Sequence, residues 1–164
     1  MQRFIVRGVL AAVLAVGIGL VSGQAPAAAA ARTEQVTITS HMTFNFPDSP
    51  NTGDFTTSGP ATDNGLICPA GTVLDTSLVI GGFQSGHGFQ VNVRKTFTCD
   101  DGSGTFFVKL VAHAATDGTE SFTWVVQGGT GAYEGLRGNG DGFTVPNDDP
   151  STGNTNNYEG SFVR

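Results

Sequence analysis

Polar and apolar residues alternate along most of the chain after about residue 35, and this pattern predicts β-strands. The longest runs are residues 36–46 and residues 89–99, where mostly apolar residues occupy every second position. A period of two over eleven residues is typical of a strand with one buried face. Shorter runs with the same period, or with many β-branched residues, predict further strands at 54–58, 65–68, 72–80, 106–114, 121–127, 137–145 and 158–163.

Turn-forming residues separate these predicted strands. Residues 100–104 and 117–118 predict hairpin loops, residues 132–136 a turn or short 3₁₀ piece, and residues 146–157 a polar loop. No segment shows the 3.6-residue period of a helix of ten residues or more. The segments at 54–58 and 65–68 are short, and seven or eight strands of the length of the others suit a sandwich or a barrel. Short hairpins between consecutive strands favour a closed antiparallel β-barrel of about eight strands, because closing a meander removes its exposed edges.

The first 31 residues predict a secretory signal peptide. Arg3 and Arg7 form a positive start, an apolar run follows at 9–21, and an alanine-rich stretch then offers A-x-A cleavage sites. A membrane anchor is the alternative, but the apolar run is shorter than the ~20 residues that span a bilayer. We therefore expect a secreted protein whose domain is residues 32–164, with no membrane association after signal cleavage.

Two cysteines, Cys68 and Cys99, follow the predicted signal peptide. Export leads to an oxidising space, where two cysteines usually pair. A redox-active or metal-binding pair is the alternative, but the spacing matches neither a C-x-x-C motif nor a zinc signature. The sequence therefore predicts one structural disulfide, no metal and no cofactor.

The charge balance restricts the partners. The chain has 8 basic and 14 acidic residues, a net charge of −6. Nucleic-acid binders usually present a basic face, so no nucleic-acid partner is expected. Charged residues make up only 13% of the chain, which argues against a coiled coil.

A glycine-rich stretch at 124–140 reads W-V-V-Q-G-G-T-G-A-Y-E-G-L-R-G-N-G. It resembles the G-G-T-G-x-[YF]-x-x-x-x-G signature of the allene oxide cyclase and dirigent superfamily, and is most similar to small secreted actinobacterial members. The similarity spans about residues 96–142 and includes the pattern from Cys99 to His113. The resemblance implies an eight-stranded antiparallel barrel with a cavity. It also implies a homo-oligomer, since plant relatives are often dimers or trimers.

The resemblance implies that the glycines and the tyrosine of the signature set the backbone geometry and the packing and take no part in chemistry. No lysine follows the glycines as a phosphate loop requires, so Gly128, Gly129, Thr130 and Gly131 predict a structural turn. Tyr133 either packs or contacts a ligand, and packing is favoured.

Two further residues are candidates for ligand binding. His87 lies between two glycines and could act as an acid or base near neutral pH. Arg94 shares a strand face with polar neighbours, and this face either lines the barrel or faces solvent. In the first case Arg94 would bind an oxyanion, and the second case is favoured.

No catalytic motif is present. The chain lacks a G-x-S-x-G elbow, and its adjacent aspartates are better explained as solvated turns. Eleven phenylalanines follow the predicted signal peptide and could line a cavity. We therefore expect the barrel to bind a small hydrophobic molecule. The alternatives are an extracellular structural or interaction module, and a cyclase, isomerase or dirigent-like enzyme that templates a reactive intermediate.

Overall fold

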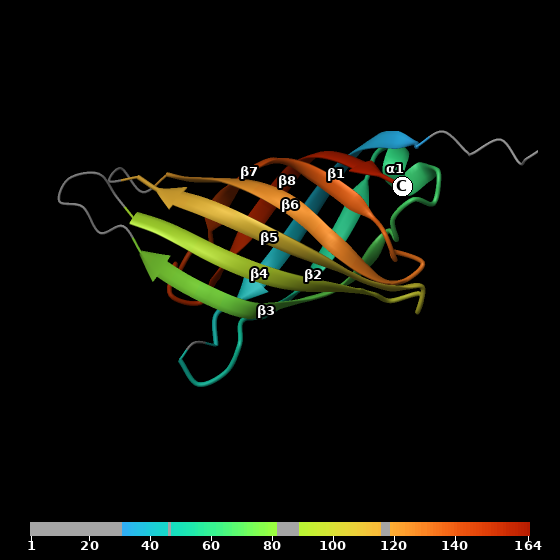
Figure 1. Cartoon of the computed structure of the whole chain (residues 1–164). Coiled ribbons are helices and arrows are strands. Elements are labelled where there is room, and N and C mark those ends of the chain that lie inside the picture. The colour runs from blue at the N-terminus through green and yellow to red at the C-terminus, as the bar shows by residue number, and fades with distance from the viewer. Residues whose placement is uncertain (1–30, 46, 82–88, 116–118) are drawn as a thin grey trace, which may run out of the picture.

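Eight antiparallel strands form a closed barrel (Figure 1). The computed structural model describes residues 31–45, 47–81, 89–115 and 119–164. Each strand pairs with the next in sequence, and β8 pairs with β1, so the predicted barrel is confirmed. A single helical turn, α1 (Pro60–Asp63), lies between β2 and β3. The strands are β1 (Thr33–Thr43), β2 (Thr52–Ser58), β3 (Ala70–Gly81), β4 (Phe89–Cys99), β5 (Gly104–Ala114), β6 (Glu120–Gly131), β7 (Arg137–Pro146) and β8 (Gly153–Val163).

The strands differ in length, and β2 is the shortest. Its pairing with β3 ends at Thr52–Leu74, whereas β3 continues to Gly81 beside β4. The β3–β4 register shifts between Asp75 and Ser77, where β3 carries a bulge. In Figure 1, β3, β4 and β5 consequently extend past β2 at one end of the barrel, which we call the open end.

Two predicted strand boundaries and one predicted strand were wrong. The first strand ends at Thr43, because Phe44 donates its backbone N–H to Thr152 and the chain turns away from β2. Residues 65–68 are not a strand; the backbone N–H groups that follow α1 fold back onto Ala61. Residues 153–157 belong to β8 rather than to a loop, because they pair with both β1 and β7.

Aromatic rings fill the half of the barrel nearest α1. Phe97 and Phe106 stack with their centroids 4.7 Å apart, and Phe55 meets Phe97 edge-on at 5.1 Å. Glycines of β7 and β8 make room for two further rings: a Cβ at Gly142 would overlap Phe122, and one at Gly160 would overlap Trp124. The rings therefore pack against one another in this half and do not line an empty cavity.

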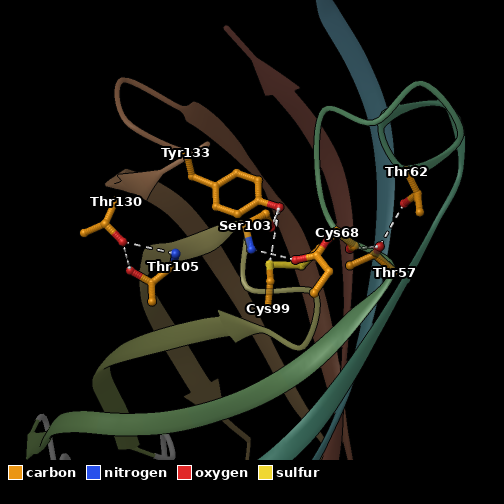
Figure 2. Close-up of a disulfide and its surroundings, with 9 residues drawn as sticks. Thr57, Thr62, Cys68, Cys99, Ser103, Thr105, Thr130 and Tyr133 are labelled. Carbon is orange, nitrogen blue, oxygen red and sulfur yellow. Dashed lines mark hydrogen bonds between the residues drawn. A yellow bond between two sulfur atoms is a disulfide. The ribbon is translucent and has the colours of Figure 1, made fainter.

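The disulfide predicted between Cys68 and Cys99 is confirmed and closes this same end (Figure 2). The two Cα atoms are 6.0 Å apart. The Thr57 hydroxyl donates to the Cys68 carbonyl at 2.6 Å, and the Tyr133 hydroxyl lies 3.3 Å from the Cys99 sulfur. The bond thus ties the segment after α1 to the end of β4.

Candidate functional site

Polar side chains gather inside the barrel between the aromatic half and the open end. Those in strands occupy the same every-second positions as the core residues, so they point inward, and Asn51 precedes β2. Six of them are buried, and Glu120 and Thr144 are half-buried. We call this set the interior polar band; it consists of Ser40, Asn51, Asp75, Lys95, Glu120, Thr144, Asn156 and Tyr158.

A buried ion pair lies at one end of the interior polar band. Lys95 Nζ is 2.6 Å from Asp75 Oδ1, and the two side chains are only 4% and 7% exposed. Asn51 Nδ2 donates to the other carboxylate oxygen at 3.1 Å. Burying two charges is costly, and this cost is offset only when partners satisfy them, as they do here. The interior of the barrel therefore holds one positive and one negative charge that neutralise each other.

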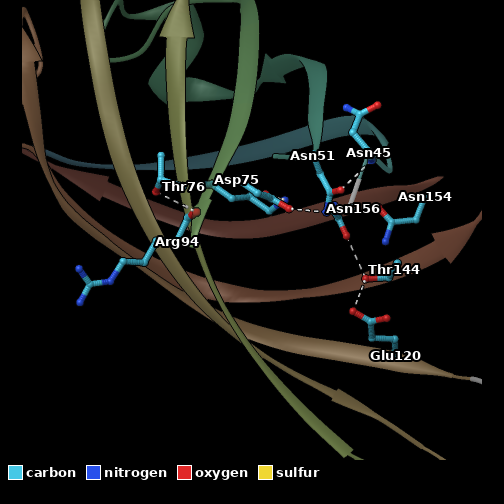
Figure 3. Close-up of polar contacts among 10 residues, drawn as sticks. Asn45, Asn51, Asp75, Thr76, Arg94, Glu120, Thr144, Asn154 and Asn156 are labelled. Carbon is cyan, nitrogen blue, oxygen red and sulfur yellow. Dashed lines mark hydrogen bonds and ion pairs between the residues drawn. The ribbon is translucent and has the colours of Figure 1, made fainter. Parts of the chain in front are cut away.

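Three residues on adjacent strands form the other end of the band (Figure 3). The Thr144 hydroxyl lies 3.2 Å from Glu120 Oε1 and 3.0 Å from Asn156 Oδ1. A hydroxyl carries one proton, so it can donate to only one of these two acceptors at a time. An acceptor in this group is therefore available to another donor.

Two hydroxyl groups in the band lack hydrogen bonds. Ser40 Oγ and Tyr158 Oη are fully buried, and neither has a partner among the described residues. Burial raises the pKa of Tyr158 well above its ordinary value, and the negative charges of Asp75 and Glu120 raise it further. Ser40 is close enough to oppose part of this rise, but the two hydroxyls do not meet in hydrogen-bond geometry. An unpaired buried hydroxyl costs about 1–3 kcal/mol, so a partner from outside the chain would be stabilising here.

Apolar side chains lie between the band and the open end. Leu78 and Val91 are half-buried against the core. Farther out on the same inward-facing rows, Ile80 is 48% exposed and Phe89 is 38% exposed. The open half of the barrel therefore carries partly exposed apolar residues at its rim and a buried polar layer farther in.

The structure places the sequence candidates apart from this band. Arg94 is exposed on the outer face, and the inward-facing cation is its neighbour Lys95. Tyr133 is buried at the closed end, where its hydroxyl lies 2.7 Å from Ser103 Oγ and its ring packs edge-on against Phe106. His87 lies outside the described residues.

The glycine signature at residues 128–131 forms the end of β6 and leads into the turn before β7. Gly128 and Gly131 have φ angles of +102° and +59°, which residues other than glycine rarely adopt. Two residues of β6 oppose Phe107 of β5 at a bulge here. These residues consequently shape the backbone at the closed end and lie away from the band.

The interior polar band could not be recognised from the amino-acid sequence for an identifiable reason. Lys95 stands in the apolar series of its strand, and Ser40 does so in β1. A polar residue at an inward position is a usable signal, but it is visible only once the inward face is known. Asn156 and Thr144 carried no signal, since polar residues surround them on both faces.

One histidine–carboxylate pair lies outside the interior polar band. His41 Nδ1 lies 3.1 Å from Asp54 Oδ2 on the exposed outer wall. No group of three or more potential metal ligands occurs in residues 31–45, 47–81, 89–115 and 119–164. Within the same ranges, no helix has the length and apolar character needed to span a membrane.

Comparisons with known proteins add no assignment. No protein-family model, no curated protein and no solved structure matches this chain. The resemblance to the allene oxide cyclase and dirigent superfamily therefore stays a prediction.

Proposed function

We propose that the protein binds a small amphipathic molecule in the open half of the barrel. The polar end of the molecule would meet the interior polar band, and its apolar body would contact Ile80 and Phe89. The observation that carries this proposal is that the fully buried hydroxyls of Ser40 and Tyr158 have no hydrogen-bond partner among the described residues. Folded proteins rarely leave such groups unpaired, and a ligand atom would supply the missing hydrogen bonds.

Packing limits the size of the ligand. The stacked rings of Phe97 and Phe106 occupy the closed half, so no long molecule would pass through the barrel. The sequence predicted a small hydrophobic ligand. We propose more narrowly that the ligand lies near the rim of the open half and has one polar end.

The charges of the band favour a neutral polar group. Lys95 is already paired with Asp75, and Glu120 adds a negative charge close to Tyr158. An anionic group would meet this negative charge, whereas a hydroxyl or carbonyl group can accept a hydrogen bond from Ser40 or Tyr158. We therefore propose an alcohol or a carbonyl compound as the ligand class.

We also propose that this binding takes place outside the cell. The positive, apolar and alanine-rich pattern of the first 31 residues supports export, and a structural disulfide is typical of oxidising compartments. The closed eight-stranded barrel is also the architecture implied by the resemblance to secreted actinobacterial proteins.

Retinol and retinoic acid provide a matched pair of probes, since they differ mainly in a neutral or anionic head group. Retinol should quench Trp124, the single tryptophan, saturably and at one site, and retinoic acid should bind more weakly. Trp124 is a suitable reporter because its ring centroid is 6.1 Å from that of Tyr158. Absence of saturable binding of either probe would refute the proposal.

Two pairs of variants locate the site. Tyr158→Phe should weaken retinol binding about tenfold, the equivalent of one hydrogen bond. Tyr133→Phe, which removes a hydroxyl at the closed end, should leave it unchanged. Phe89→Glu should weaken binding, whereas Gln90→Glu places the same charge on the outer face of the same strand. Equal effects within either pair would show that the probe binds elsewhere.

A further inference from the structure

Among the described residues, the outer half of β3 has a strand partner on one side only. Beyond Leu74, β3 continues to Gly81 and pairs with β4 on one side. Within the described residues, no strand pairs with the other side of residues 77–81. Figure 1 shows this edge running past the end of β2. Its backbone N–H and C=O groups are therefore positioned to accept another strand.

The composition of this edge favours pairing. Residues 77–81 read S-L-V-I-G, without a charge or a proline. Val79 is 58% exposed on the outer face. Natural proteins usually protect exposed edges with charged residues, prolines or short strands, and none of these protects this segment. Its high β-propensity and lack of charge are typical of segments that pair with another chain.

A cleft of 330 Å³ lies beside the start of this edge. One wall is the β1–β2 loop at 47–51, and the other is β3 at 75–78. The loop stands beside the strand, so a single extended segment would fit there more readily than a second barrel. Asp48 is the only exposed charged residue in the lining, since Asp75 is buried against Lys95. A basic residue at the cleft end of the segment would complement Asp48.

We propose that residues 77–81 form a docking edge that accepts one extended polypeptide segment as an added β-strand. The segment contains alternating β-branched residues and carries a basic residue near Asp48. Main-chain hydrogen bonds supply affinity in this mode of recognition, and side chains on alternate positions supply selectivity. The docking edge is on the wall of the barrel, and the proposal stands independently of ligand binding in the interior.

The probes are two seven-residue peptides that alternate valine and threonine, one ending in lysine and the other in glutamate. The lysine peptide should shift the backbone amide signals of residues 77–81 saturably in NMR spectra and slow their hydrogen exchange. The glutamate peptide should bind several-fold more weakly. The proposal would be overturned if the lysine peptide caused no saturable shift of the amide signals of residues 77–81, or if both peptides bound equally well.

Two variants with the same substitution separate edge docking from surface charge. Val79→Lys introduces the protective residue found on natural edges and should weaken peptide binding at least tenfold. Val125→Lys places the same charge on β6, which is paired on both sides, and should leave binding unchanged. Retinol binding should survive in both variants. A different result would show that the proposal is wrong. If, without peptide, hydrogen exchange at residues 77–81 slows as the protein concentration rises and the mass in solution doubles, a second copy of the chain occupies the edge.

Discussion

Tyr158→Phe should make the protein more resistant to alkaline unfolding. Complete burial, followed by the charges of Asp75 and Glu120, raises the pKa of Tyr158 above its ordinary value of 10.0. In the unfolded chain the phenol ionises near that ordinary value, but in the folded protein it stays neutral. Ionisation of Tyr158 therefore leaves the free energy of unfolding unchanged below about pH 10. Above that pH the free energy of unfolding falls, because only the unfolded chain loses the proton.

The magnitude follows from the single proton involved. Each pH unit above the unfolded pKa lowers the free energy of unfolding by up to about 1.4 kcal/mol, so the loss reaches about 2 kcal/mol near pH 11.5. Phenylalanine removes this dependence. At neutral pH the substitution should be neutral or slightly stabilising, because the removed hydroxyl has no hydrogen-bond partner among the described residues.

Urea unfolding followed by Trp124 fluorescence, near pH 7 and near pH 11.5, measures this difference. Tyr133→Phe is the control: it removes a hydroxyl that lies 2.7 Å from Ser103 Oγ, and should cost about 1 kcal/mol at neutral pH. The reasoning fails if the advantage of Tyr158→Phe over the wild type does not grow with pH. It also fails if Tyr158→Phe costs as much as Tyr133→Phe at neutral pH.

Three further substitutions test the packing and the covalent framework by denaturant unfolding. Lys95→Met leaves Asp75 buried without its cation and should cost about 3–5 kcal/mol, whereas adding Asp75→Leu should recover most of the loss; an additive double variant would contradict this. Replacing Cys68 and Cys99 with serine should lower the free energy of unfolding by about 3–4 kcal/mol, because the disulfide joins residues that are 31 positions apart in the sequence and so restricts the unfolded chain. An unchanged free energy of unfolding would refute that estimate. Gly142→Ala places a methyl group against the Phe122 ring and the Asn157 backbone oxygen and should cost about 1–3 kcal/mol; a neutral result would mean that both the ring and the backbone of β8 give way freely.

The alternation of side chains in the sequence was sufficient to predict most of the strands and the closed barrel. A period of two identifies residues that share a face, and short hairpins favour neighbouring strands as partners. The cysteines were few enough to permit one pairing. The β7 segment was predicted nearly correctly despite its glycines, because its turn residues delimit it on both sides.

Only the tertiary structure decided which polar residues lie inside. Arg94 and Lys95 are adjacent, so their side chains point to opposite faces, and only closure of the barrel makes the Lys95 face the inner one. The polar first half of β8 is a strand because two neighbours pair with it, not because of its own pattern. The free edge of β3 likewise depends on where β2 ends. Local sequence sets the period of a strand, whereas burial and pairing depend on segments distant in the chain.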